Sequence, residues 1–296
     1  MAGPIRSMLY APGNKPRLVS KVATFGSDAI ILDLEDAVPI AEKVATRDAV
    51  RAALPTLQPG PLRYVRVNSL DTGWTFADLD AVVCADLDGI KLPKVESPRD
   101  LELVDLHLRR LERDRGLPEG RIDLAPIIET ARGVLNAREI AASGTRVRKL
   151  GFGAGDYCRD VGTRFSGNLW EADGLELISA RTQVVLASRA AGLDPPIDTV
   201  WLDIRDNEGL ERDATVALRL GFQGKSAIYP GQIEVIHRVF SPSAADIDYA
   251  RRVDAAFAEA EAAGSASIQV DGRLVDYPIA IKARWLLERA RGFGLC

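Results

Sequence analysis

Residues 124–129, Leu-Ala-Pro-Ile-Ile-Glu, are a short apolar run that ends in the carboxylate of Glu129. A second run, Lys-Leu-Gly-Phe over residues 149–152, leads through the turn Gly-Ala-Gly to Asp156. Apolar runs of this length are typical of strands in a parallel sheet that helices cover on both faces. Because the carboxyl ends of parallel strands meet at one edge of the sheet, we expect Glu129 and Asp156 to lie close together.

Six further runs of the same kind are found at residues 7–10, 29–32, 63–67, 89–92, 199–202 and 224–227. Helical spacing of apolar residues separates them, over 15–24, 39–54, 98–115, 133–143, 174–191 and 207–220. Strand–helix units that alternate eight times predict an α/β protein of the closed (β/α)8, or TIM, barrel class. An open, doubly wound sheet is the alternative fold.

The pattern changes after residue 240. Ser241-Pro242-Ser243 marks a break, and an alanine-rich helix is predicted over 245–264. Residues 268–276 contain Asp271-Gly272 between two short extended runs, which predicts a hairpin, and a last helix follows over 279–291. We therefore interpret residues 1–240 as the catalytic barrel and residues 241–296 as a C-terminal helical and hairpin extension, or lid, of the same domain unit.

Composition narrows the class of ligand. A net charge of −4 over 296 residues disfavours a nucleic-acid partner or an anionic membrane surface. The first ten residues lack the apolar core of a signal peptide, and no run is long enough to span a bilayer. Three widely spaced cysteines fit a reducing compartment. We expect a cytoplasmic protein that acts on small molecules.

Glu129 and Asp156 are the predicted metal ligands. Carboxylate oxygens suit Mg²⁺, with Mn²⁺ as an alternative, because such a site keeps positions open for water and substrate oxygens. The competing interpretation is that the two acids stabilise the N-termini of the helices that follow them. With only two histidines and no paired cysteines, a zinc site is disfavoured.

Other charged residues follow the predicted strands. Asp33, Glu35 and Asp36 come after the second strand, and Arg66 lies at the end of the third. Local salt bridges among these residues are the alternative to a role in the site, and Arg66 in particular could pair with Glu129 or Asp36.

Lys94 follows the fourth strand. It could form a Schiff base, but we favour a solvated ion pair, because Glu96 lies beside it in the same loop.

Two glycine-containing turns could contact a ligand. The turn Pro12-Gly13-Asn14-Lys15 can present backbone amides and a lysine to a phosphate group. The turn Gly153-Ala154-Gly155 allows the backbone to approach a ligand closely, although it lacks the spacing of a dinucleotide-binding fingerprint.

Several segments, in this order, resemble the citrate lyase β-subunit family within the HpcH/HpaI aldolases, and are similar to malyl- and citramalyl-CoA lyases. The resemblance covers nearly the whole chain. It rests on RSMLYAPGN at 6–14, LDLEDAV at 32–38, VRVN at 65–68, LPK at 92–94, IETARG at 128–133, FGAGD at 152–156, LGFQGK at 220–225 and VDGRLVDYP at 270–278. Gly155 is a departure, since an acidic residue is common before the aspartate in citrate lyase β subunits.

The resemblance implies a (β/α)8 barrel that assembles as a homotrimer or a multiple of it. It implies Mg²⁺ bound by Glu129 and Asp156, and contact of Arg66 with the reacting substrate. Asp276 would act as the proton carrier in the active site of a neighbouring subunit, although it could instead only cap the last helix.

The turn at residues 12–15 would lie near the thioester carrier. We place Glu35 and Asp36 as groups that orient a metal-bound water or Arg66.

The implied activity is a magnesium-dependent carbon–carbon lyase. It would cleave a 3-hydroxyacyl thioester, such as citramalyl-CoA or malyl-CoA, into a 2-oxoacid or glyoxylate and an acyl-CoA. A first alternative is the β subunit of citrate lyase, which acts on citryl bound to an acyl carrier protein. A metal-dependent aldolase for free 2-oxoacids and a non-catalytic scaffold that binds a CoA metabolite are the others.

Overall fold

The computed structural model describes residues 4–163 and 169–296. The chain divides into two compact units, one of Ile5–His237 and one of Arg238–Cys296 together with Pro4. Each unit is described separately below.

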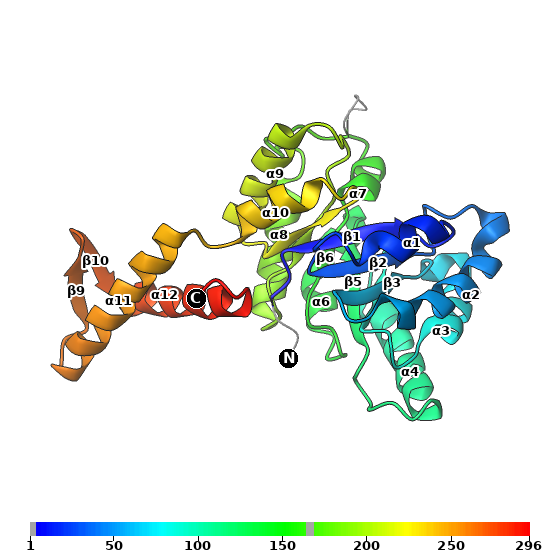
Figure 1. Ribbon diagram of the computed structural model, residues 1–296, viewed down its shortest axis with the longest axis horizontal. Helices are drawn as coiled ribbons and strands as arrows, with labels where there is room; N and C mark the ends of the chain where they lie inside the picture. Colours follow the sequence, from blue (N-terminus) through cyan, green and yellow to red (C-terminus); the bar gives the residue numbers. More distant parts are fainter. Residues whose placement is uncertain (1–3, 164–168) are drawn as a thin grey trace. The chain divides into compact units, whose positions relative to one another are not determined.

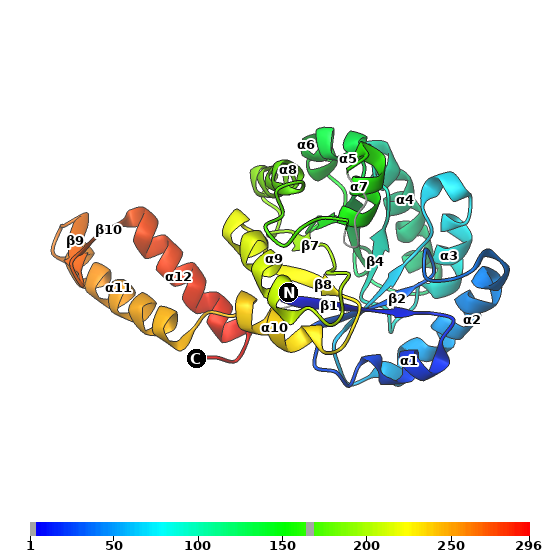
Figure 2. The ribbon, with the colours of Figure 1, turned by 90° about the horizontal axis from the view of Figure 1, so that it is seen from above.

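The first unit is a closed barrel of eight parallel strands in sequence order, which confirms the predicted (β/α)8 fold (Figures 1 and 2). Figure 2 shows the helices arranged around the strands. The strands are β1 (Ser7–Pro12), β2 (Ala29–Asp33), β3 (Leu62–Arg66), β4 (Gly89–Leu92), β5 (Asp123–Ile128), β6 (Gly151–Phe152), β7 (Ile197–Asp198) and β8 (Gly224–Ala227).

Helices follow or precede each strand of the barrel. They are α1 (Pro16–Val22), α2 (Lys43–Ala53), α3 (Thr75–Val82), α4 (Pro98–Asp114), α5 (Ala131–Leu135), α6 (Ala137–Ala141), α7 (Ala154–Val161), α8 (Ile178–Ala190), α9 (Asn207–Leu220) and α10 (Gln232–Phe240), with 3₁₀ turns η1 (Ile40–Glu42), η2 (Leu54–Leu57) and η3 (Leu70–Thr72). The helix α4 begins with a capping box between Ser97 and Asp100, which satisfies amides of its first turn.

Apolar side chains fill the amino-terminal half of the barrel interior. Met8, Ile31, Tyr64, Ala125 and Ile197 belong to one buried cluster there. The Tyr64 ring packs so closely on β4 that a β-carbon at position 89 would lie 2.3 Å from it, which explains the glycine found there. With this half filled, the carboxyl ends of the strands are left as the open mouth of the barrel.

The seventh strand was predicted at the wrong residues. It lies at Ile197–Asp198, ahead of the apolar run at 199–202. That run is apolar for another reason, because Trp201 is buried outside the sheet with its ring 6.2 Å from that of Trp170.

Some helices also differ from the prediction. The helix predicted over 133–143 is two short helices, α5 and α6, that meet at Asn136, whose side chain donates a hydrogen bond to the carbonyl of Glu96. The helices α3, α7 and α10 were not predicted from the sequence.

A network of four buried charges lies on the outer side of β7 and β8. Arg181 from α8 and Lys225 from β8 both contact Asp198 and Asp213, at distances of 2.5 to 2.9 Å, and all four side chains are fully buried. The charges of the two cations and the two carboxylates compensate one another in this cluster. The ion pairs therefore connect α8 and α9 to strands β7 and β8 of the barrel.

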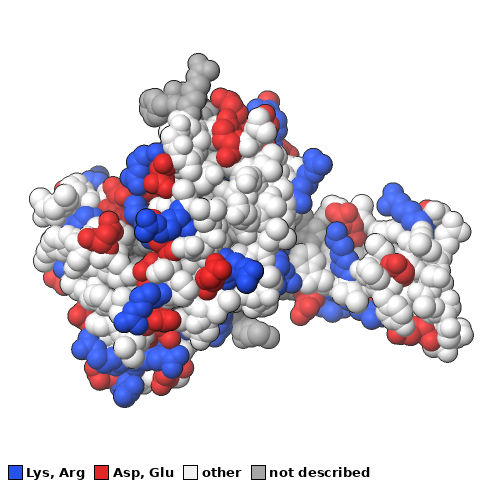
Figure 3. Space-filling view, turned by 180° about the vertical axis from the view of Figure 1, so that it is seen from behind, with Lys and Arg blue, Asp and Glu red and all other residues white. Residues whose placement is uncertain are grey.

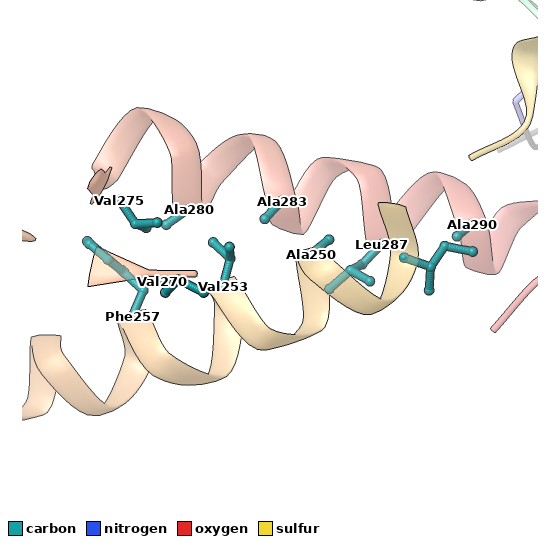
Figure 4. Close-up of a cluster of buried hydrophobic side chains, with 10 residues drawn as sticks. Ala250, Val253, Phe257, Val270, Val275, Ala280, Ala283, Leu287 and Ala290 are labelled. Atoms are coloured by element: carbon teal, nitrogen blue, oxygen red, sulfur yellow. The ribbon is translucent and has the colours of Figure 1, made fainter. Parts of the chain in front are cut away.

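The second unit contains α11 (Ala244–Ala262), the antiparallel pair β9 (Ser267–Val270) and β10 (Arg273–Asp276), and α12 (Tyr277–Gly292). In Figure 4, Val253 and Phe257 of α11 lie among Ala280, Ala283 and Leu287 of α12 in an apolar core. The predicted hairpin is confirmed. Its turn residues Asp271 and Gly272 both have positive φ, as the Asp-Gly pair of a tight hairpin requires.

Charge of both signs is distributed over the surface. On the face shown in Figure 3, lysine and arginine are interspersed with aspartate and glutamate. Among the described residues, no helix combines the length and the apolar character that crossing a membrane requires.

Candidate active site

A cavity of about 300 Å³ opens at the mouth of the barrel. Its lining brings together residues from almost every strand end, which are Tyr10, Pro12, Asp33, Asp36, Ala37, Arg66, Lys91, Ile127, Glu129, Phe152, Gly153, Gly155, Asp156, Thr199, Val200, Ser226 and Ile228. Both predicted metal ligands and the predicted substrate-binding arginine are among them, so the structure brings these three residues together at one cavity.

Glu129 follows β5 directly and is only 3% exposed. Its Oε1 accepts a hydrogen bond from the backbone amide of Lys94 at 2.8 Å. Burial, followed by the charge of Glu35, raises the pKa of Glu129 to about 8, and Asp156 adds to the rise. A carboxylate in this position is therefore stabilised by a nearby positive charge.

Asp156 lies in the first turn of α7, a helix that the sequence analysis missed. Its carboxylate contacts Lys94 Nζ at 3.2 Å and Arg159 at 2.8 Å. The first turn of α7 faces the cavity. Asp156 can therefore stabilise the N-terminus of α7 and also take part in the site.

Lys94 lies between the acids of the site. Its Nζ is 2.6 Å from Glu35 and 3.2 Å from Asp156. Although burial opposes it, Glu35 and then Glu129 raise the pKa of Lys94, so the amine is charged. The predicted ion pair exists, but its partners are Glu35 and Asp156 rather than Glu96, and the side chain is mostly buried rather than solvated. The loop places Lys94 in a left-handed conformation, with φ of 53°, which turns its side chain inward.

Arg66 ends β3 and is fixed by Asp33 on the neighbouring strand. Nε and one terminal nitrogen of Arg66 each lie 2.7 Å from an oxygen of Asp33, which forms a bidentate pair. The Asp33 carboxylate also accepts hydrogen bonds from the backbone amides of Glu35 and Ala37. These bonds fix the position of Asp33 and, through it, that of Arg66. Burial opposes the charged form of Asp33, but Arg66 holds the pKa of Asp33 below its usual range.

The remaining terminal nitrogen of Arg66 contacts the two predicted supporting acids. It lies 2.9 Å from Glu35 and 3.3 Å from Asp36. The guanidinium also lies over the ring of Tyr10, 5.1 Å from its centroid. Of the two partners considered for Arg66 as an alternative to a role in the site, Asp36 is in contact with it, but Asp33 is the main partner.

The turn at residues 12–15 lies only partly at the cavity. Pro12 lines it, but the amide of Gly13 donates to the carbonyl of Asp33, and that of Lys15 donates to the carbonyl of Pro12. These two amides are therefore not available to a phosphate. Asn14 bonds Glu42 through its side-chain nitrogen, and the side chain of Lys15 is exposed.

The second glycine turn supplies the start of α7. Gly153 is its N-cap residue, and the amide of Ala154 donates to Thr199 Oγ1 at 3.0 Å. Gly153 and Gly155 line the cavity, whereas Ala154 does not. The open first turn places helix amides beside the acids, which favours an anionic ligand group.

Lys91, on the inner side of β4, was missed by the sequence analysis as a cavity residue. Burial, followed by the charge of Arg66, lowers the pKa of Lys91 to about 7. A lysine within an otherwise apolar strand was the signal available in the sequence. Tyr10, Thr199 and Ser226 gave no comparable signal, since their role depends on which way each strand faces.

Asp276 belongs to the second unit, where it is the N-cap residue of α12. Its carboxylate accepts a hydrogen bond from the backbone amide of Ile279, with a donor–acceptor distance of 3.4 Å. The capping interaction considered for this residue is therefore present, and its role in proton transfer stays a prediction.

The chemistry of the donor set fits a magnesium ion. Within residues 4–163 and 169–296, no group of three or more metal-binding side chains occurs. The carboxylates of Glu129 and Asp156 both line the cavity. Magnesium is commonly bound by one or two carboxylates and completed by water and substrate oxygens. Burial and the charges of Glu35 and Asp156 raise the pKa of Glu129, so a divalent ion beside it would favour its carboxylate form.

Comparison with known proteins gives a consistent result. The model of the HpcH/HpaI aldolase/citrate lyase family matches residues 6–230. Citrate lyase subunit beta of Leuconostoc mesenteroides subsp. cremoris is 39% identical over 287 residues, which cover 96% of this chain and 93% of that protein. The (3S)-malyl-CoA thioesterase of Cereibacter sphaeroides is 39% identical over 294 residues, with coverage of 99% and 97%.

A solved structure agrees with these matches. The protein CitE from Mycobacterium tuberculosis, in complex with magnesium, acetoacetate and coenzyme A, superposes with a TM-score of 0.75. It is 31% identical, and the match covers 98% of each chain.

Proposed function

The chain belongs to the HpcH/HpaI aldolase/citrate lyase family, which includes carbon–carbon lyases, and we propose that it cleaves a 3-hydroxyacyl thioester with the aid of magnesium. The products are a 2-oxoacid and an acyl thioester. The single observation that supports this most is the convergence of Glu129, Asp156 and Arg66 on one cavity at the barrel mouth.

Glu129 and Asp156 are the proposed metal ligands. When bound, magnesium supplies positive charge that lowers the pKa of the substrate hydroxyl and stabilises the oxygen of the forming 2-oxoacid. The magnesium and acetoacetate in the similar CitE structure support this assignment. The amides at the start of α7 are placed to bind the carboxylate of the 2-oxoacid portion.

Arg66 is the proposed partner of the other product. The substrate hydroxyl loses its proton to solvent and its oxygen becomes the carbonyl oxygen of the 2-oxoacid. As the carbon–carbon bond breaks, its electron pair passes to the thioester portion and forms an enolate. Arg66 is permanently charged and is fixed in direction by Asp33, so it can stabilise the enolate oxygen without reorganising.

Asp276 is the proposed proton carrier. It delivers a proton to the enolate carbon in the cleavage direction and removes one in the condensation direction. In the assembled protein, a homotrimer or a multiple of it, we propose that this residue acts in the site of a neighbouring subunit.

The acyl group and its carrier are not distinguished by the relatives, because two with different names are equally similar at 39% identity. Malyl-CoA and citramalyl-CoA are therefore the first substrates to test. Citryl bound to an acyl carrier protein is the alternative, in which case the chain works as a subunit of a complex.

The test is an assay of the purified protein alone with each CoA thioester, with and without EDTA. Release of a 2-oxoacid, with loss of activity in EDTA and in Glu129→Gln, supports the proposal. Release of free CoA thiol without 2-oxoacid would show thioester hydrolysis, as the name of the second relative suggests for that protein. Activity only after addition of partner subunits would favour the citrate lyase complex.

A further inference from the structure

Lys94 contacts both of the proposed metal ligands. Its backbone amide donates a hydrogen bond to Glu129 Oε1 at 2.8 Å, and its Nζ lies 3.2 Å from Asp156 Oδ2. The backbone at Lys94 is left-handed, with φ of 53°, which residues other than glycine seldom adopt. In this conformation one residue holds one acid with its main chain and the other acid with its side chain.

Both oxygens of the Asp156 carboxylate are in contact with a cation. Oδ2 contacts Lys94, and Oδ1 contacts Arg159 at 2.8 Å. A magnesium ion at Asp156 is therefore repelled by a positive charge beside either oxygen. Water screens the side chain of Arg159, which is 68% exposed, far better than that of Lys94, which is 19% exposed. The charge of Lys94 consequently opposes the metal more strongly.

The ammonium group of Lys94 compensates the same acids as a bound metal would. Besides its contact with Asp156, it lies 2.6 Å from Glu35, an acid whose side chain is almost fully buried. Buried carboxylates require positive charge beside them, and Lys94 supplies it in the metal-free protein. A divalent ion at Glu129 and Asp156 supplies it instead when bound. The ammonium group and the metal thus compete for Asp156.

Lys94 can leave Asp156 without losing all of its partners. Glu35 is the nearer acid, and Oδ1 of the exposed Asp36 lies 4.0 Å from Nζ. A rotamer change of the long side chain can exchange Asp156 for Asp36 while the contact with Glu35 is kept. Because the backbone does not have to move, the amide of Lys94 continues to hold Glu129.

We propose that Lys94 is a positioning residue that holds both metal-binding acids in the metal-free protein and competes with magnesium for Asp156. It thereby sets the affinity of the site for the metal. This inference rests on the proposed function. It gives the charge of Lys94 an effect opposite to that of a purely structural role, because removal of a structural support would weaken metal binding.

The test is a calorimetric titration of the metal-free protein with magnesium chloride alone. Lys94→Met keeps an unbranched side chain but lacks the charge, and Lys94→Arg keeps the charge. Arg159→Met removes the exposed cationic partner of Asp156, and Lys21→Met removes the charge of an exposed lysine on α1. Thermal unfolding of each variant verifies that it is folded.

We expect Lys94→Met to bind Mg²⁺ at least about tenfold more tightly than wild type, because a charge that repels the metal is removed. Lys94→Arg, Arg159→Met and Lys21→Met should stay within about threefold of wild type, since the first keeps the charge and the other two remove charges that water screens. Unchanged or weaker binding by folded Lys94→Met would overturn the inference, and so would equal tightening in Arg159→Met. If neither wild type nor Lys94→Met bound magnesium, the proposed function itself would fail.

A structure of the wild-type protein with bound magnesium is a second measurement, which does not depend on the folding of a variant. We expect Lys94 Nζ to lie more than about 4 Å from both oxygens of Asp156, beyond the range of an ion pair, and to remain in contact with Glu35. A metal bound to Glu129 and Asp156 with the contact between Lys94 and Asp156 unchanged would overturn the inference and leave the proposed function standing.

Discussion

The Glu129 carboxylate lies directly against Gly153, so that a β-carbon on Gly153 would stand 2.2 Å from Oε2. The substitution Gly153→Ala should therefore displace the carboxylate from the proposed metal position. We expect Mg²⁺ to bind at least about tenfold more weakly, with a loss of about 1–3 kcal/mol in stability from overpacking. Calorimetric titration and urea unfolding measure the two effects.

Gly155→Ala is the matched control, because a β-carbon there has no heavy atom within 4 Å. Its affinity for Mg²⁺ should stay close to that of wild type. Equal weakening in both variants would mean that flexibility of the turn, and not contact with Glu129, determines metal binding.

The charge of both proposed ligands should be required for metal binding. Glu129→Gln and Asp156→Asn preserve shape but remove the negative charge that Mg²⁺ binds. We expect turnover to be abolished and Mg²⁺ affinity to fall, without unfolding of the barrel. Glu139→Gln, at an exposed position on α6, serves as the control. Wild-type rates in either site variant would refute the metal assignment.

Replacement of Arg66 by lysine tests how much the fixed orientation of the guanidinium group contributes to kcat. Lysine keeps the charge but lacks the two-pronged donor that pairs with Asp33. We predict a decrease in kcat of about 10²- to 10³-fold, as for loss of one oxyanion donor, with little change in binding of the 2-oxoacid. A kcat within threefold of wild type would exclude Arg66 from stabilising the enolate.

Asp276→Asn should stop proton transfer while preserving the start of α12, because asparagine is also a good N-cap residue. Exchange of the acyl α-proton with solvent deuterium, followed by NMR, should fall to background. If deuterium enters at the wild-type rate, Asp276 is not the proton carrier.

Mixing Arg66→Lys with Asp276→Asn tests whether Asp276 acts between subunits. Refolded mixed oligomers should regain part of the activity, because some sites then contain one intact Arg66 and one intact Asp276 from different chains. Mixtures no more active than the average of the two parents would contradict action across subunits.

The buried charge network should be important for stability. Lys225→Met leaves Asp198 and Asp213 with only Arg181 as a partner, and an uncompensated buried charge costs about 3–5 kcal/mol. Urea unfolding measures the loss, and Lys21→Met should change stability by less than about 0.5 kcal/mol. A decrease of less than 1 kcal/mol in the free energy of unfolding of Lys225→Met would contradict this prediction. It would show that water reaches and solvates the carboxylates of Asp198 and Asp213.

Much of the fold could be predicted because its signals are local. Seven of the eight strands coincide with apolar runs, and the Asp271-Gly272 turn specifies its hairpin. The run at 199–202 misled the prediction because burial of Trp201 outside the sheet produces the same composition as a strand. Composition reports burial, but it does not report which layer a residue is buried in.

The site was predicted less completely, because its partners are distant in sequence. Glu129 and Asp156 could be placed at the strand ends from sequence because each acid comes shortly after an apolar strand, which is a local pattern. The pairing of Lys94 with Glu35 depends on a left-handed backbone and spans 59 residues, so no local pattern could reveal it. The inward direction of Lys91 likewise depends on strand register, which the sequence does not specify.

The most direct test of the account is a crystal structure with Mn²⁺ in place of Mg²⁺ and a bound 2-oxoacid, with the metal located by its anomalous scattering. The account predicts one peak between Glu129 and Asp156, ligated by both carboxylates and by oxygens of the 2-oxoacid. A peak bound elsewhere in the cavity, or a bound 2-oxoacid with those two side chains free of metal, would contradict it.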